Sequence, residues 1–282
     1  MAEVRPPRAD RDRYADDVNG VWKEAMEQLL SYRYFGTRSV LGGRSLSTGS
    51  MPVRSDTRVG EGGILLAPVA IGMLDAAGNM IDRHYQLGLT QIDIHCFDGA
   101  PGAARIGFQS EWVREARTQT FTETTITDEG DGRLVGHGSA NWAVINPTPP
   151  GFVYTDPGPG PEDRPPMPPL WQVFEAERKG PADYMISGLS PRLGTDTLHH
   201  GPILVVMEQA ALDLAVAQAK GRPIVPVALS CRIVRAGRKG PFAIGAVPLA
   251  ITGDLLSYRC EFRDEGRNNE LVATMLWQAR LH

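Results

Sequence analysis

Two stretches of this chain decide its fold: GGILLAPVAIGMLDAAGNMI at residues 62–81 and GPILVVMEQAALDLAVAQAKG at residues 201–221. In both, apolar and small residues cover nearly every helical face, so each helix must be enclosed rather than laid on a surface. Strand-like runs follow each helix, over Gly62–Ile145 and Gly201–Leu281. The sequence therefore predicts an α+β protein with the same unit twice, each a curved antiparallel sheet wrapped around one central helix.

Alternation of apolar and polar residues locates the strands. In QIDIHCF at residues 91–97, every second side chain is apolar, which predicts that one face of this strand meets the helix. The dipeptide Asp131-Gly132 separates two strand-like runs, as a hairpin turn requires, and Arg263–Ala273 repeats the arrangement in the second copy. Matching hairpins at matching positions support the internal repeat.

The chain divides into four segments. We expect an N-terminal extension at 1–35, with an amphipathic helix in Val18–Tyr34 that docks on the outside, and a first unit at 36–146. The segment 147–180 holds ten of the chain's 22 prolines and predicts a semi-rigid, passive connection, because proline neither pairs in a sheet nor continues a helix. The second unit follows at 181–282.

Composition excludes several classes of protein. A net charge of -4 leaves no basic stripe for nucleic acid, so we expect no nucleic-acid partner. Three widely spaced cysteines, Cys96, Cys231 and Cys260, favour reduced thiols over a disulfide framework. The first residues lack the apolar core of a signal peptide, and no membrane span is expected, which makes the cytoplasm the expected location. No metal-ligand spacing appears, so we predict no metal.

The stretch Leu89–Ile145 resembles the hot-dog thioesterases, and in particular the phenylacetate-pathway type of acyl-CoA thioesterase. The likeness is carried by a strand, the loop Arg114–Thr118 and the ending Asp128–Val135. Two copies in one chain, with the closing strand Leu271–Thr274, look like the double hot-dog arrangement of type II acyl-CoA thioesterases. The resemblance implies a double hot-dog fold and hydrolysis of an acyl-CoA thioester, with coenzyme A as part of the substrate and no other cofactor.

The second helix carries the strongest chemical signal. Glu208 sits among apolar neighbours that make a buried carboxylate costly unless it has a purpose. In the hot-dog thioesterases the acid lies on this helix with a His-Gly pair before it, which implies that Glu208 is the catalytic base or nucleophile and that His199 assists. Gly201 at the helix start would admit the substrate carbonyl, and first-turn N–H groups would stabilise the oxyanion.

Alternatives remain open on this helix. Glu208 would be merely structural if it reached solvent or paired with an arginine. Asp213 is expected to be solvated and to pair locally with Gln209 at i,i+4. In the first copy, Asp75 is the only acid on the helix, and we interpret it as a polar contact rather than a catalyst.

Further residues are predicted to bind the substrate. From the second copy these are His200 and Gln209, with Ser230 as the nearest hydroxyl on the second strand and Gln278 on the closing strand. Gln278 is one residue from the position the resemblance implies, a shift that would turn it to the opposite sheet face. The first copy is expected to contribute to a site at the interface of the units, through His95, Arg114, Arg117 and Thr118, with the arginines also suited to coenzyme A phosphates.

Two other functions fit the same residues. An acyl-CoA hydratase or dehydratase of this fold would use a histidine and an acid, such as His199 or His200 with Glu208. A non-catalytic acyl-CoA binding protein would need neither, and the first copy's lack of a histidine before its helix is consistent with it. Exposed sheet edges also predict a possible homodimer of double units.

Overall fold

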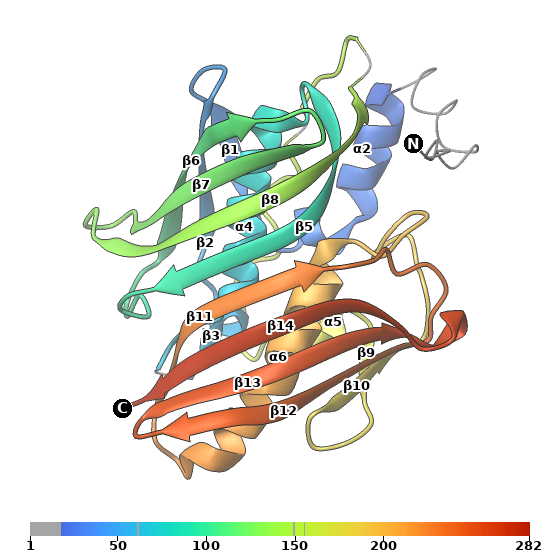
Figure 1. The fold of residues 1–282 in the computed structure, drawn as a ribbon. Helices are drawn as coiled ribbons and strands as arrows, with labels where there is room; N and C mark the ends of the chain where they lie inside the picture. Colours follow the sequence, from blue (N-terminus) through green and yellow to red (C-terminus); the bar gives the residue numbers. More distant parts are fainter. Residues whose placement is uncertain (1–17, 61, 149, 155) are drawn as a thin grey trace.

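The computed structural model describes residues 18–60, 62–148, 150–154 and 156–282 of the chain. The part of the predicted N-terminal extension that spans residues 1–17 lies outside the described residues. The remaining residues form one large antiparallel sheet with two long helices against one of its faces (Figure 1).

The first half of the sheet is built around α4 (Leu66–Ile81), and its strands precede and follow that helix. They are β1 (Arg38–Leu41), β2 (Leu46–Pro52), β5 (Tyr85–Cys96), β6 (Arg105–Glu115), β7 (Gln119–Asp128) and β8 (Leu134–Pro147). The short η1 (Ser55–Thr57), β3 (Arg58–Val59) and β4 (Gly63–Ile64) lead into the helix, with β3 and β4 paired as a separate ribbon.

The second half repeats the arrangement around α6 (His200–Ala219). Its elements are α5 (Leu170–Val173), β9 (Ala176–Arg178), β10 (Asp183–Ile186), β11 (Ile224–Ile233), β12 (Phe242–Thr252), β13 (Leu255–Asp264), η2 (Glu265–Arg267) and β14 (Glu270–Leu281). The strand order β1-β2-β6-β7-β8-β5-β11-β14-β13-β12-β10-β9 is the same in the two halves when it is counted outward from the centre. This symmetry agrees with the repeat predicted from the sequence.

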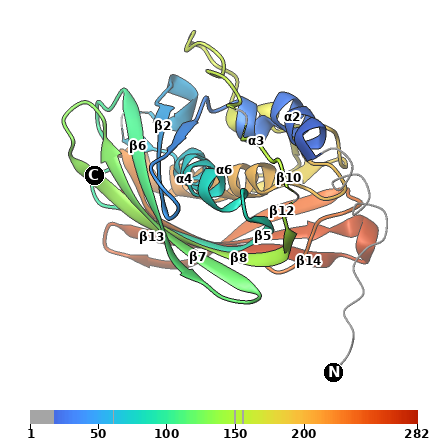
Figure 2. The same cartoon turned by 90° about the horizontal axis from the view of Figure 1, so that it is seen from above.

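The two halves meet where β5 pairs antiparallel with β11. Gln91 lies opposite Arg232 and His95 opposite Ala228, so one continuous sheet of twelve strands crosses the boundary between the units. Seen from above, the sheet curves around α4 and α6, which lie next to each other in its hollow (Figure 2). The boundary between the units is therefore both a strand pair and a helix pair.

Both central helices are enclosed, as their composition predicts. Every residue of α4 is buried, and most of α6 is buried as well. By length and hydropathy alone α6 is apolar enough to cross a bilayer, but 67% of its apolar window lies inside the protein. Since the sheet removes both helices from water, burial of these side chains is the main stabilising contribution to the fold.

The strand predictions are confirmed in detail. Ile92, Ile94 and Cys96 are buried on the helix side of β5, while His95 is exposed on the other side. The turn around Asp131-Gly132 joins β7 to β8, and the segment predicted as the second hairpin joins β13 to β14. The sheet thus has an inner, apolar face and an outer face that meets solvent.

The proline-rich connection is bound to the first unit, unlike the passive spacer we expected. Asp163 accepts hydrogen bonds from the N–H and the hydroxyl of Ser55, at 3.1 and 2.6 Å. Gly36 lies so close to the carbonyl of Pro159 that a Cβ would approach its oxygen to 2.1 Å. The second unit's sheet also starts inside the predicted connection, because β9 begins at Ala176.

The predicted N-terminal helix is two helices. α2 (Val18–Gln28) ends just before Leu29, and α3 (Leu30–Arg33) turns inward from there. Leu29, Leu30 and Ser31 are buried, and α3 packs against α6. α3 is therefore part of the core, whereas the described residues of α2 are mostly exposed, as predicted for a helix on the outside.

Candidate functional site

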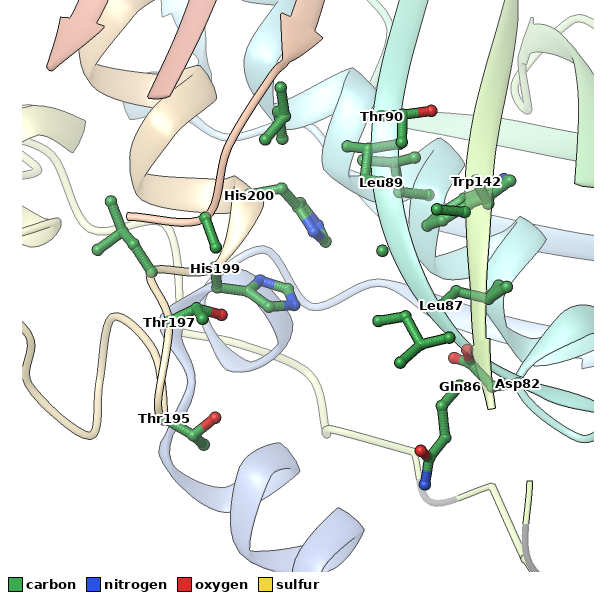
Figure 3. Close-up of a pocket in the computed structure, with 18 of the residues that line it drawn as sticks. Asp82, Gln86, Leu87, Leu89, Thr90, Trp142, Thr195, Thr197, His199 and His200 are labelled. Atoms are coloured by element: carbon green, nitrogen blue, oxygen red, sulfur yellow. The ribbon is translucent and has the colours of Figure 1, made fainter. Parts of the chain in front are cut away.

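A cavity of about 510 Å³ opens between the two units, along one side of α4 and at the start of α6. Its walls come from α4, β5, β8, the proline-rich connection, α3 and the segment before α6 (Figure 3). The side chains with polar groups that line it are those of Tyr32, Asp75, Asp82, Tyr85, Gln86, Thr90, Trp142, Thr148, Tyr154, Thr195, Thr197, His199, His200, Arg235 and Arg238. Both units and the connection thus contribute to one site.

Two adjacent histidines face this cavity at the start of α6. Figure 3 shows His199 and His200 side by side, and their ring centroids are 3.9 Å apart. His199 Nε2 lies 3.2 Å from the hydroxyl of Tyr32, whereas His199 Nδ1 and His200 Nε2 are buried with no partner among the described atoms. Burial lowers the pKa of His199 to about 4 and that of His200 well below its usual value. Both imidazoles are therefore neutral near pH 7.

Asp75 supplies a carboxyl group from the first unit's helix to the same cavity. Its Oδ2 is hydrogen-bonded by the hydroxyl of Thr37, and its Oδ1 is buried without a partner in the described structure. Burial is the main cause that raises the pKa of Asp75 well above its ordinary value. Burial thus favours the neutral form of the Asp75 carboxyl group, and in that form it can donate a hydrogen bond.

The start of α6 opens on the cavity. His199 is the N-cap residue, its side chain makes no capping hydrogen bond to the first turn, and His199, His200 and Ile203 all line the cavity. Gly201 does not admit a ligand at its Cα, because a Cβ there would meet Ser31 Oγ at 2.1 Å. The glycine is required for the close approach of α3, which differs from the role we expected for it.

Glu208 lies elsewhere, at the start of the other central helix. Its carboxylate accepts hydrogen bonds from the backbone N–H groups of Leu66 and Ala67, at 2.8 and 2.7 Å, and from the indole of Trp277 at 2.9 Å. The side chain is buried, does not line the cavity, and burial raises the pKa of Glu208 to about 7 despite these three donors. It also lies seven residues from Gly201, about 10 Å along the helix axis. Glu208 and Gly201 therefore do not share one reacting carbonyl.

Neither structural alternative that we weighed for Glu208 applies, since it reaches neither solvent nor an arginine. The local pair on the same helix is confirmed: Gln209 donates to Asp213 at 2.8 Å. Asp213 is further bound by Tyr184 and Arg178. Gln209 is thus held at the opposite side of α6 and does not line the cavity.

Three of the predicted binding residues lie on the outer face of the sheet. His95 is exposed there, Ser230 donates to Asp93, and Gln278 donates to Ser257 at 2.9 Å. The neighbour of Gln278, Trp277, points inward to Glu208, which confirms that the one-residue shift turns Gln278 away from the helices. The sheet separates these side chains from the cavity.

Arg114, Arg117 and Thr118 lie at the hairpin between β6 and β7, with exposed side chains. The carbonyl of Thr118 accepts from the N–H of Val144, at 3.0 Å, next to cavity residues of β8. The hairpin is therefore near the cavity, but none of its side chains lines it.

Several residues of the cavity were not predicted as site residues. Tyr32 comes from the N-terminal extension and Tyr154 from the proline-rich connection, which the sequence pattern presents as peripheral. Asp82 lies at the end of α4, and burial raises its pKa to about 8. A signal was available for Asp75 and Asp82, because they are seven residues apart, two turns along one helix face. Within the described residues no three His, Cys, Asp or Glu side chains are grouped as metal ligands.

The fold and the site define a class of protein: a hot-dog type of α+β fold with an acid- and histidine-lined cavity between its two units. Residues 195–270, which contain the two histidines and α6, match the model of the Thioesterase superfamily. The resemblance to hot-dog thioesterases drawn from the sequence is confirmed by this match and by solved structures. A search of curated proteins gives no significant match.

Three of the similar solved structures each cover more than nine-tenths of this chain. The tesB protein of Mycobacterium avium subsp. paratuberculosis has a TM-score of 0.60 at 13% identity, covering 94% of this chain and 99% of that one. A hot-dog protein of unknown function from Alicyclobacillus acidocaldarius has a TM-score of 0.61 at 14% identity, covering 93% and 98%. The acyl-CoA thioesterase II TesB2 of Mycobacterium marinum has a TM-score of 0.56 at 13% identity, covering 92% and 97%. At these identities the likeness shows the fold.

Proposed function

We propose that this protein is a double hot-dog acyl-CoA thioesterase that hydrolyses its substrate in the cavity between the two units. The observation that carries the proposal is the joint position of His199, His200 and Asp75 on one cavity, within a fold and a family match that belong to thioesterases. An acyl thioester placed there would lie in one cavity with two neutral imidazoles and with a carboxyl group whose neutral form is favoured by burial.

The protonation states favour a definite course of reaction. His200 Nε2 accepts a proton from water while the water oxygen attacks the thioester carbonyl carbon. Hydrogen bonds from the Asp75 carboxyl group and from N–H groups at the start of α6 stabilise the negative charge that develops on the carbonyl oxygen. When the C–S bond breaks, the sulfur takes the proton from the imidazolium, which yields the free acid and coenzyme A.

Glu208 has a different part in this proposal from the one we expected. Its two oxygens are already bound to the first turn of α4 and to Trp277, so we assign it the position of a cap that joins the two helices. A catalytic role for Glu208 stays a prediction. In that case turnover would depend on Glu208, whereas the reaction proposed above depends on Asp75.

The test is thiol release from a panel of short, long, branched and aromatic acyl-CoAs by the wild type, Asp75→Asn and Glu208→Gln, each checked for folding by thermal melting. We expect wild-type turnover on at least one acyl-CoA and its loss in Asp75→Asn. Loss in Glu208→Gln alone, at unchanged stability, would move the catalytic acid to Glu208. No thiol release from any substrate would contradict hydrolysis.

Hydration or dehydration of an acyl-CoA is a second candidate, favoured by the same protonation states. A neutral imidazole can take a proton from water as its oxygen adds to Cβ of an enoyl-CoA, while a protonated carboxyl group gives its proton to Cα. Loss of enoyl-CoA absorbance without thiol release would identify this reaction. Binding of coenzyme A without either reaction would identify a binding protein.

A further inference from the structure

We propose that the loop Arg235–Gly240, between β11 and β12, is the docking site for the phosphate groups of coenzyme A. The inference rests on the proposed function, because it assigns one end of the cavity to one end of that substrate. It also gives a role to the cationic side chains of Arg235, Arg238 and Lys239, which take no part in the proposed hydrolysis.

The loop lies at the cavity. Arg235, Ala236 and Arg238 are among its lining residues, and both arginines are exposed to solvent at the same time. They stand at the second unit's side of the cavity, after β11, whereas Asp75 and Asp82 lie on α4 of the first unit. A ligand with a negatively charged end would therefore keep that end at the arginines.

The backbone of the loop is held in one conformation by a single buried carboxylate. Asp264 accepts hydrogen bonds from the N–H groups of Arg238, Lys239 and Gly240, at 2.8, 3.1 and 2.9 Å. Asp264 is only 1% exposed, and its charge is met by these three donors. Because the backbone is already ordered, a ligand that binds the loop's side chains need not order the loop itself.

Two of the loop's cationic side chains, those of Arg238 and Lys239, are available to bind a phosphate. Arg235 pairs with Glu270 at 2.9 Å, and the same carboxylate is 3.3 Å from Arg267. For Arg238 and Lys239 the described residues include no side-chain partner, and Glu265 is a nearby exposed acid. Arginine binds phosphate oxygens through two parallel N–H donors, so Arg238 is the residue on which we place the phosphate.

The hairpin with Arg114 and Arg117 is the competing position, since we expected those arginines to contact phosphates. Their side chains are exposed and do not line the cavity. Arg117→Glu is therefore a matched control for Arg238→Glu: each reverses one exposed arginine close to the cavity, and neither belongs to the proposed catalytic group.

The experiment compares an acyl-CoA with the same acyl group on N-acetylcysteamine, which has the thioester but no phosphate. For Arg238→Glu we expect KM for the acyl-CoA to rise roughly tenfold, while kcat/KM for the short thioester stays unchanged, because a charge-assisted pair is lost only with the phosphates. Arg117→Glu should leave both substrates unaffected. An unchanged KM in Arg238→Glu, or an equal rise in Arg117→Glu, would overturn the assignment.

A binding measurement separates this inference from the proposed function. Adenosine 3′,5′-bisphosphate, titrated into the wild type by calorimetry, should bind, and Arg238→Glu should weaken that binding roughly tenfold. If neither thioester is hydrolysed but this binding pattern is found, the docking site stands and the thioesterase proposal fails. If thioesters are hydrolysed and the bisphosphate binds both proteins equally or neither, the docking site is wrong and the thioesterase remains.

Discussion

The starts of α4 and α6 occupy equivalent places in the two halves of the molecule, yet their surroundings are opposite. The first turn of α4 is closed by Glu208 from the other unit and is buried in the core. The first turn of α6 receives no capping hydrogen bond from the side chain of its N-cap residue, His199, and meets a cavity through His199 and His200. The start of α4 thus stabilises the contact between the two units, whereas the start of α6 is open to a ligand.

Every helix begins with N–H groups that lack an intrahelical acceptor, and an apolar core makes them costly to leave unmet. In the first unit, the carboxylate of Glu208 accepts hydrogen bonds from first-turn N–H groups of α4. In the second unit, the oxygen of a bound ligand would accept hydrogen bonds from first-turn N–H groups of α6. A duplicated fold can therefore keep one interface for stability and the other for chemistry.

The largest expected effect that tests this comparison is the stability change in Glu208→Ala. Removing the carboxylate leaves the N–H groups of Leu66 and Ala67 and the Trp277 indole without an acceptor, so we expect a loss of about 4 kcal/mol. Urea denaturation of the wild type and the variant measures it. Gln209→Ala, which removes one hydrogen bond from the same helix, should cost about 1 kcal/mol. A loss below 1 kcal/mol in Glu208→Ala would show that the cap is not structural.

Asp75→Asn tests the cavity that the start of α6 meets. The amide keeps the shape of the side chain but replaces the acidic O–H, which stabilises the oxyanion in the proposed reaction, with a weaker hydrogen-bond donor, so we expect kcat to fall by about 10²- to 10³-fold. The free energy of unfolding should change by less than about 1 kcal/mol, because burial already disfavours the charged form of this carboxyl group. Steady-state kinetics with denaturation of the same sample separates the two. Unchanged kcat would remove Asp75 from the reaction.

A substitution of His200 tests whether this residue is the base in the reaction. His200→Gln should lower kcat by about 10²-fold, since the amide cannot act as the base. His137→Gln is the control, because His137 lies on the opposite face of the sheet, where its nearest acid is Glu123 at 4.0 Å. Equal turnover in the two variants would place the base elsewhere.

The smallest expected effect is a pH dependence of the free energy of unfolding that arises from Glu208 at the start of α4. Because burial raises the pKa of Glu208 to about 7, well above the ordinary value of a glutamate, the folded state binds the proton more tightly than the unfolded state. This contribution is present at low pH and is lost as pH rises toward 7, by roughly 2 kcal/mol between pH 5 and pH 7. Glu208→Gln should lack this slope in denaturation series at several pH values. Parallel curves for the two proteins would contradict it.

The sequence predicts the fold better than the site. The enclosed helices, the face of the strand at residues 91–97 and the Asp131-Gly132 turn follow from local periodicity and turn chemistry. Glu208 was correctly recognised as a buried acid with a purpose, but its partners Leu66 and Ala67 lie about 140 positions away. Local patterns carry no information on such a pair, since it depends on how the two units dock.

The same limit explains the overlooked cavity residues. Tyr32 and Tyr154 come from segments whose composition indicates only an extension and a connection, and tertiary packing alone brings them to the cavity. The sequence indicates a polar contact for Asp75 because this residue lies further along its helix than the position that corresponds to the acid, and because no histidine precedes that helix. The histidines that share its cavity belong to the other copy, so a comparison within each copy could not bring them together.

The junction between β5 and β11 has a consequence for how the chain can be divided. A protease cut within the proline-rich connection would leave two fragments still joined along a strand pair and by the packed central helices. Such a nicked molecule should elute from a sizing column as a single species until a denaturant is added. Fragments produced separately should find each other through the same edge, which makes this chain a natural candidate for a split reporter.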